Sequence, residues 1–212
     1  MQEQDKHKNY WYSLCSRYGA SEAWINKSFN QITEAYSSGK RHYHNLNHIN
    51  DLLKSAEEYK SIITDYDSVN FAIWFHDLVY NAIASDNEEK SASLANKWMQ
   101  ELKISEEQIN KVVYMIMVTK NHMSFADPND NDTSLFLDFD LKILGQERNI
   151  YREYMNKIRQ EYSLVPDLLY NPGRKKVLKK FLEAESLYKT EEFKKLYEDK
   201  ARANIQFELE QL

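Results

Sequence analysis

The sequence is poor in the residues that build disulfides, zinc–thiolate sites and tight turns. It contains one cysteine, Cys15, so an internal disulfide and a multi-cysteine zinc site are both excluded. Only 4 glycines and 3 prolines occur in 212 residues, which is little turn chemistry for a strand-rich fold. We therefore expect helices, and any bound metal must be held by nitrogen and oxygen atoms.

Long apolar runs and an excess of positive charge are missing as well. No segment reaches the roughly 18 apolar residues that would span a bilayer. The net charge is −5 and no Lys/Arg block stands out that would attract nucleic acid or an anionic membrane. We expect a soluble, cytoplasmic protein with neither nucleic acid nor a membrane as a partner.

What is present favours one all-α domain over residues 1–212. The hydrophobic content of 42% is enough for a sizeable core. The apolar spacing predicts helices over about 9–18, 21–36, 44–59, 69–80, 85–102, 105–120 and 135–144, and three more towards the C-terminus. Ser85 to Glu88 has capping-box spacing, residues 126–134 predict a loop, and Gly145 suits a left-handed C-cap.

Several polar residues stand where apolar ones are expected. In the helix predicted over 135–144, a step of 100° per residue places Asp140 among the apolar side chains and Asp138 on the opposite side. Asp138 therefore fits a helix cap or an ion pair. A carboxylate pointing inwards at Asp140 needs a partner or a cation, because an isolated buried charge is costly.

Histidines raise the same question in two other segments. In the helix predicted over 44–59, the projection gives an apolar face with His48 at its rim and His44 beside it; the face comprises Ile49, Leu52, Leu53, Ala56 and Tyr59. His44 and His48 are four residues apart, so on a helix they reach a common point. Bonds to backbone carbonyls would explain that pair alone. His76 and Asp77, however, interrupt the apolar run "AIWFHDLVY", where water is not expected to solvate them. A structural His76–Asp77 pair would leave His48 and Asp140 unexplained.

One divalent metal would satisfy all of these groups together. Two imidazoles, His48 and His76, and two carboxylates, Asp77 and Asp140, form a mixed nitrogen and oxygen set suited to Mn, Fe, Co, Ni, Zn or Mg. Four protein ligands leave an octahedral ion two positions for water or substrate. Such an ion acidifies water and polarises a phosphoryl oxygen.

These residues resemble the HD-domain superfamily of metal-dependent phosphohydrolases, whose signature is a His, a His-Asp doublet and a distant Asp. The segments "RHYHNLNHI", "AIWFHDLVYN", "DNEEKSA" and "LFLDFDLKILG" are similar, in order, to an uncharacterised branch of that superfamily. The resemblance implies an HD-like helical bundle with additional C-terminal helices and a metal-binding core at about 40–145. "YHNLNH" also resembles a segment of cyclic nucleotide phosphodiesterases, which implies that His44 is the general acid.

The chain departs from the relatives that hold two metals. It lacks a further His after His76-Asp77 and has no adjacent His-His pair; Asp86, Glu88 and His122 are the candidates for holding a second ion. The candidates for contacting a substrate are Arg41, Asp86, Glu88, Lys120 and His122. For Arg41 and Lys120 the alternative is an ordinary exposed charge. For Asp86 and Glu88 the alternative is a helix start, where negative charge is favourable.

The expected function is hydrolysis of a phosphate ester of a nucleotide or another small metabolite. Water activated by the metal attacks phosphorus, with Asp77 among the catalytic groups and His44 protonating the leaving oxygen. The rival interpretation is a regulatory module that binds metal or nucleotide without turnover. A helical interaction protein without a metal is a third.

Overall fold

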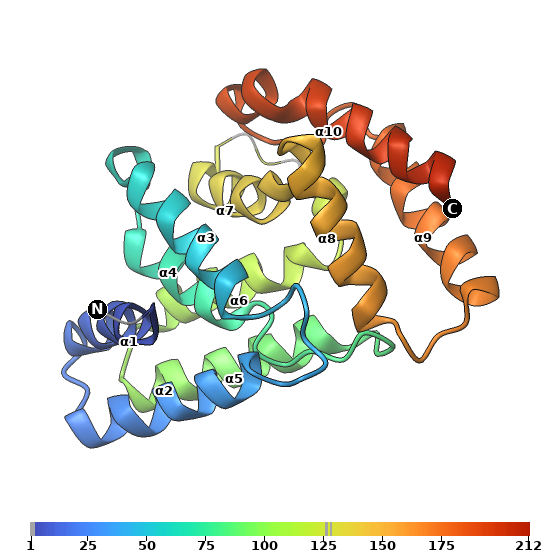
Figure 1. Cartoon of the computed structure of the whole chain (residues 1–212). Coiled ribbons are helices and arrows are strands. Elements are labelled where there is room, and N and C mark those ends of the chain that lie inside the picture. The colour runs from blue at the N-terminus through green and yellow to red at the C-terminus, as the bar shows by residue number, and fades with distance from the viewer. Residues whose placement is uncertain (1–2, 126, 128) are drawn as a thin grey trace. The chain divides into compact units, whose positions relative to one another are not determined.

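The computed structural model describes residues 3–125, 127 and 129–212, and these residues form helices and no strand (Figure 1). The all-α prediction is confirmed. The α-helices are α1 Glu3–Ser16, α2 Glu22–Tyr36, α3 Leu46–Glu58, α4 Tyr66–Phe75, α5 Asn87–Glu101, α6 Glu106–Thr119, α7 Asn131–Leu141, α8 Arg148–Glu161, α9 Asp167–Glu183 and α10 Glu191–Gln211. Short 3-10 helices are η1 Lys60–Ile62, η2 His122–Ser124 and η3 Lys142–Gly145.

The chain forms two compact units, Met1–Lys120 and Asn121–Leu212. The metal-binding core predicted over about 40–145 extends across the boundary between them. The prediction of a single domain stays a prediction. Within the described residues, no helix combines the length and the apolar character needed to cross a bilayer.

The first unit is built around α4, whose residues 71–75 are inaccessible to solvent. Helices α3, α5 and α6 pack against it. The predicted apolar face of α3 is confirmed, since its members are all buried: Ile49, Leu52, Leu53, Ala56 and Tyr59. Trp11 lies edge-on to Trp74 and Phe75, with ring centroids 5.6 and 5.9 Å apart. This aromatic core fixes α4 and therefore the residues at its end.

The second unit places α10 against η3, α8 and α9. The prediction that Gly145 is a left-handed C-cap is wrong, because positive φ angles occur at Gly19 and Lys103 in the part of the chain that the structure describes. A Cβ at Gly145 would lie 2.5 Å from the Cβ of Tyr197 and 2.9 Å from the hydroxyl of Tyr188. Glycine is required here by the close approach of α10.

Two predicted helix starts also differ from the structure. α7 begins at Asn131, inside the predicted loop, because Asp130 caps it by accepting bonds from Thr133 N and Oγ1 at 3.0 and 2.6 Å. Ala126 and Pro128 of that loop lie outside the described residues. The capping box predicted for α5 is wrong, since the N-cap is Asp86 and its side chain makes no capping bond to the described residues.

Candidate metal centre

The segment before α3 is a series of turns held by an asparagine. Asn45 is the N-cap of α3, and its Oδ1 accepts the N–H of Asn47 at 2.9 Å. Its amide donates to the carbonyl of His42 at 2.9 Å. The predicted helix start at His44 is therefore wrong by two residues, and His44 lies in a turn. The His44 and His48 rings still approach one another, with centroids 5.9 Å apart.

The His76-Asp77 doublet stands at the end of α4 rather than within it. The predicted helix to Tyr80 ends at Phe75, and His76 is its C-cap, with its N–H donating to the carbonyl of Ala72 at 2.9 Å. The chain turns directly after the cap. Because of this turn, the imidazole of His76 and the carboxylate of Asp77 reach the same point, which adjacent residues within a helix do not.

Three of the four predicted metal ligands come together in the first unit. The Nε2 atoms of His48 and His76 are 3.3 Å apart. Oδ2 of Asp77 lies 3.1 Å from His76 Nε2 and 3.8 Å from His48 Nε2. Donor atoms about 2.1 Å from a common ion are about 3.0 Å apart at octahedral angles and about 3.4 Å at tetrahedral angles. Two of the three separations match these values, and the third, between His48 and Asp77, is wider, so the three residues form a group that could hold one divalent cation.

The tautomer of His76 also suits a metal ligand. Its Nδ1 lies 2.9 Å from the carbonyl oxygen of Ile73. A carbonyl oxygen only accepts, so Nδ1 carries the proton, and in a neutral ring Nε2 then presents a lone pair. That lone pair is directed at another imidazole nitrogen and a carboxylate oxygen. A proton or a cation among these atoms would hold them together, and a backbone carbonyl behind the ring is the usual support of a metal-binding histidine.

The electrostatic environment keeps Asp77 ionised. Burial raises the pKa of this carboxyl, but the positive charge of the imidazoles of His76, His44 and His48 in their protonated forms outweighs burial, and the pKa lies well below its ordinary value. The side chains of His48 and His76 are 3% and 1% exposed, whereas that of Asp77 is 19% exposed. The group is therefore buried on the histidine side and reached by solvent on the carboxylate side.

Arg41 fixes the backbone around this group. Its guanidinium donates to the carbonyls of Asp77 at 2.6 Å, Leu78 at 2.9 Å and His44 at 3.3 Å. It also lies over the rings of Tyr36 and Tyr80, 4.9 and 5.3 Å from their centroids. These contacts give Arg41 a positioning role. The phosphate contact that we expected of it stays a prediction.

His44 is held by aromatic rings beside the group. Its imidazole lies 4.4 Å from the Tyr80 ring at an interplanar angle of 31°, and 5.0 Å from the Tyr43 ring. It is also close enough to Asp77 to lower the pKa of that carboxyl. A half-buried imidazole with these neighbours is well placed for proton transfer near the Asp77 carboxylate.

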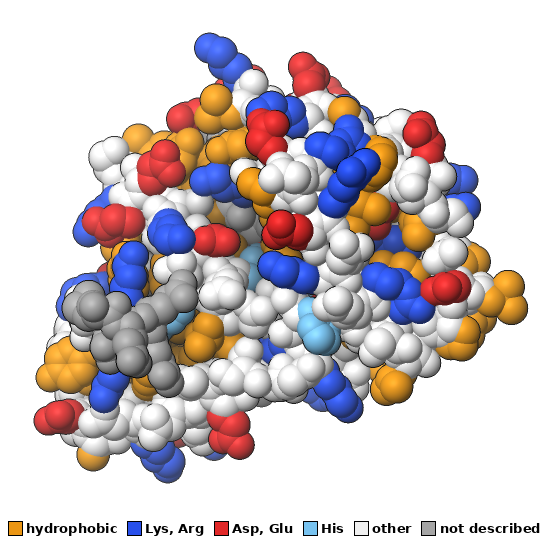
Figure 2. Space-filling model, viewed as in Figure 1, with side chains coloured by type: hydrophobic (Ala, Val, Ile, Leu, Met, Phe, Trp, Pro, Cys, Tyr) orange, Lys and Arg blue, Asp and Glu red, His pale blue; other side chains and the backbone are white. Residues whose placement is uncertain are grey.

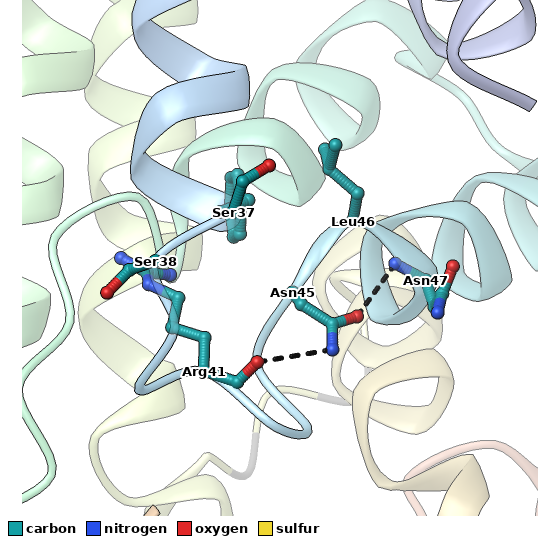
Figure 3. A pocket seen from close by; sticks show the side chains of 7 residues that line it. Ser37, Ser38, Arg41, Asn45, Leu46 and Asn47 are labelled. Carbon is teal, nitrogen blue, oxygen red and sulfur yellow. Dashed lines mark hydrogen bonds between the residues drawn. The ribbon is translucent and has the colours of Figure 1, made fainter.

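Figure 3 shows a surface pocket of about 260 Å³ beside the same turns, lined mainly by polar residues. The lining residues are Tyr36, Ser37, Ser38, Arg41, Asn45, Leu46 and Asn47. In this view the Asn45 amide lies between Arg41 and Asn47 and bonds to the backbone on each side. The pocket therefore borders the turns that carry His44.

Asp140, the fourth predicted ligand, belongs to the second unit. Its Oδ2 lies 2.8 Å from Nε2 of His122, and both side chains are 14% exposed. The expectation that Asp138 points outwards is wrong, because Asp138 is fully buried. The expectation that Asp140 points inwards agrees with its small exposure. A metal-binding role for Asp140 and a substrate contact by His122 stay predictions.

Asp138 joins α7 to the start of α10. Its carboxylate accepts the N–H groups of Lys189 and Thr190 at 2.6 and 2.8 Å and the Thr190 hydroxyl at 2.7 Å. Burial raises the pKa of Asp138 to about 6, although the bonds from these donors act in the opposite direction. Asp138 is a structural carboxylate.

The remaining substrate candidates lie around the start of α5. Lys120 donates to the carbonyl of Ser85 at 2.7 Å and pairs with Glu89. Asp86 pairs with Lys90 at 2.9 Å and is exposed, whereas Glu88 is half-buried in the first turn. These contacts fasten the loop before α5 to the end of α6. Substrate binding by Asp86, Glu88 and Lys120 stays a prediction.

Sequence reasoning missed Tyr80 and the carbonyl of Ile73. A backbone carbonyl leaves no trace in a sequence, so the support behind His76 could not be found there. Tyr80 follows the doublet closely, but it is far in the sequence from His44, so no sequence signal indicated their contact. No protein-family model, curated protein or solved structure matches this chain.

Proposed function

We propose that the chain is a metal-dependent hydrolase of phosphate esters, a member of the HD-domain superfamily that its motifs resemble. The observation that carries the proposal is the convergence of His48, His76 and Asp77, with their ligand atoms all within 4.8 Å of one another. Two imidazoles and one carboxylate would hold a single divalent ion. Asp140 is the predicted fourth ligand. A nucleotide or another small phosphorylated metabolite is the proposed substrate.

Each group in the first unit has a task in this reaction. A bound divalent ion would supply Lewis-acid chemistry, which lowers the pKa of water and polarises a phosphoryl oxygen. The carboxylate of Asp77, kept ionised by its neighbours, offsets the charge of the ion. Water forms a bond to phosphorus while the ester bond breaks, and His44 in its protonated form gives a proton to the leaving oxygen. Arg41 holds the backbone of His44 and Asp77 in register.

The role of His44 can be tested with leaving groups of different basicity. His44→Asn should keep the metal, because His44 is not among the three residues that would hold it. Turnover of alkyl phosphates, whose alkoxide needs a proton, should fall by about 100-fold or more, since general acid catalysis contributes that much. Turnover of p-nitrophenyl phosphates should change far less, because p-nitrophenolate leaves without a proton.

The screen compares wild type, His44→Asn and Asp77→Ala on phosphomonoesters and phosphodiesters after loading with each candidate metal. Metal-dependent turnover that is lost in Asp77→Ala is the expected result. Activity that survives removal of the metal would overturn the proposal. A protein that retains its metal, gains thermal stability with a nucleotide and forms no product would instead be the regulatory module.

A further inference from the structure

The turn between α8 and α9 exposes three leucines. Leu164, Leu168 and Leu169 are 85%, 84% and 67% accessible to solvent. They lie within six residues of one another, at the end of the turn and in the first turn of α9. Single exposed leucines are ordinary, but a local cluster of them marks an interaction surface. Figure 2 shows hydrophobic side chains at the right edge of the view, where Figure 1 places the start of α9.

This turn is rigidly built. Arg159 donates to the Tyr162 carbonyl at 2.7 Å and to the Val165 carbonyl at 3.0 Å. It also binds Asp167 Oδ1 through two nitrogens, at 2.6 and 3.0 Å, and lies over the Tyr170 ring. These contacts of Arg159 hold the turn so that the leucines face outwards, and its positive charge offsets the negative charge of Asp167. Exposed apolar groups that are held in place lose little entropy when they dock.

Lysines continue the same face along α9. Leu169, Lys176 and Lys180 are spaced by seven and four residues, and Lys179 lies beside them, on the side of the helix opposite the buried Leu178. All three lysines are exposed. Among the described residues none of them has a carboxylate partner in an ion pair. Glu183 is the acidic residue at the far end of this face. An exposed apolar end followed by unpaired positive charge is the pattern of a helix that lies on a membrane surface.

We infer that the start of α9 docks the protein on the surface of an anionic lipid bilayer. Leu164, Leu168 and Leu169 would enter the boundary between headgroups and acyl chains, and Lys176, Lys179 and Lys180 would lie among the anionic headgroups. The whole-chain charge of −5, from which we expected no membrane partner, averages over this local basic face.

The composition of the face favours lipid over protein or nucleic acid. Protein interfaces concentrate their binding energy in Trp, Tyr and Arg, whereas this face offers leucine and lysine. Single-stranded nucleic acid stacks on aromatic rings or on Arg, but Tyr170 is buried and the guanidinium of Arg174 is bound to Glu208. An anionic bilayer requires only positive charges near its surface and apolar groups to insert.

The test is co-sedimentation of the full chain with vesicles. Phosphatidylcholine vesicles containing about one third phosphatidylserine should bind the chain, and pure phosphatidylcholine vesicles should bind it far less. Binding should weaken as salt is raised, since each lysine contributes about five-fold to affinity through screened charge. Failure to bind the anionic vesicles, or equal binding to both kinds, would overturn the inference.

Matched variants locate the surface. Lys176→Gln, Lys179→Gln and Lys180→Gln together should lower binding about 100-fold. The same change at three other exposed lysines, Lys27, Lys97 and Lys195, should lower it far less.

Replacement of two leucines tests the apolar part of the surface. Leu164→Ser with Leu168→Ser should lower binding about 100-fold. The control is Ile62→Ser with Leu196→Ser, since Ile62 and Leu196 are each 49% exposed. Because the sites are exposed, far-UV circular dichroism should show each variant folded. Controls that lose as much binding as the test variants would contradict docking through α9.

Discussion

The two units each bury a group of charged side chains, and they stabilise these groups differently. In the second unit, Glu208 accepts bonds from Arg174 Nε at 2.7 Å and from the Tyr151 hydroxyl at 2.5 Å. In the first unit, by contrast, His48, His76 and Asp77 direct ligand atoms towards one another. A buried charge that protein donors surround is structural, whereas acceptors that converge at the spacing of metal ligands indicate a site.

The Glu208 network should give the largest loss of stability when it is broken. Glu208→Ala removes the acceptor of two buried groups, the guanidinium of Arg174 and the hydroxyl of Tyr151. Burial raises the pKa of Tyr151, so its hydroxyl stays protonated and is left as a donor without this acceptor. Because the side chains of Arg174 and Glu208 are 10% and 2% exposed, we expect a loss of about 3–5 kcal/mol in the free energy of unfolding.

Urea denaturation followed by far-UV circular dichroism measures this change. The four tryptophans, Trp11, Trp24, Trp74 and Trp98, all belong to the first unit, so their fluorescence follows that unit separately. Glu210→Ala, at an exposed position on the same helix, is the control and should change little. A change at Glu208 no larger than the control would remove the contrast between the two groups.

Asp138 should give the next largest effect. Asp138→Asn replaces one accepting oxygen with an amide that faces the donors of Lys189 and Thr190. A buried donor left without an acceptor costs about 1–3 kcal/mol, and the same denaturation experiment measures the loss. Thr190→Ser keeps the hydroxyl and should cost much less. If Asp138→Asn were as stable as wild type, the carboxylate would not be the element that joins α7 to α10.

Replacing Arg41 should give the smallest of these effects. The result distinguishes a positioning role of Arg41 from a contact with the substrate phosphate. Arg41→Lys keeps the charge but loses most of the bonds to the carbonyls of Asp77, Leu78 and His44. Groups that orient metal ligands are worth about 10- to 100-fold in metal affinity, and we expect a loss at the lower end, measured by metal titration. Lys40→Gln, at the exposed neighbouring position, is the control. Unchanged metal affinity with a raised KM would instead support the predicted phosphate contact.

Sequence periodicity was informative where a helix has two different faces. α3 is amphipathic, and its apolar face was predicted residue by residue. α7 is buried almost all round, from Asp132 to Phe139, so its apolar side chains define no single inward direction, and the projection placed the fully buried Asp138 on the outside. Gly145 was misread for a related reason, since glycine serves both left-handed turns and close packing.

Part of the candidate site could be predicted because its chemistry conflicts with its surroundings. His48, His76 and Asp77 were singled out as polar residues in apolar segments, and the structure brings them together. The positioning role of Arg41 and the contact of Tyr80 with His44 depend on the turns before α3 and after α4. Such turns follow from tertiary packing, which the local pattern does not encode.

If His48, His76 and Asp77 hold a divalent metal, the metal content of the purified protein depends on them. Plasma mass spectrometry would compare wild type with the His76→Ala, Asp77→Ala double variant after reconstitution with Mn, Fe, Co, Ni, Zn and Mg. Asp51→Ala, which removes an exposed carboxylate from α3, is the control. We predict stoichiometric metal in wild type and control and none in the folded double variant. Metal absent from all three proteins, or equal in all three, would show that these residues do not hold a divalent metal.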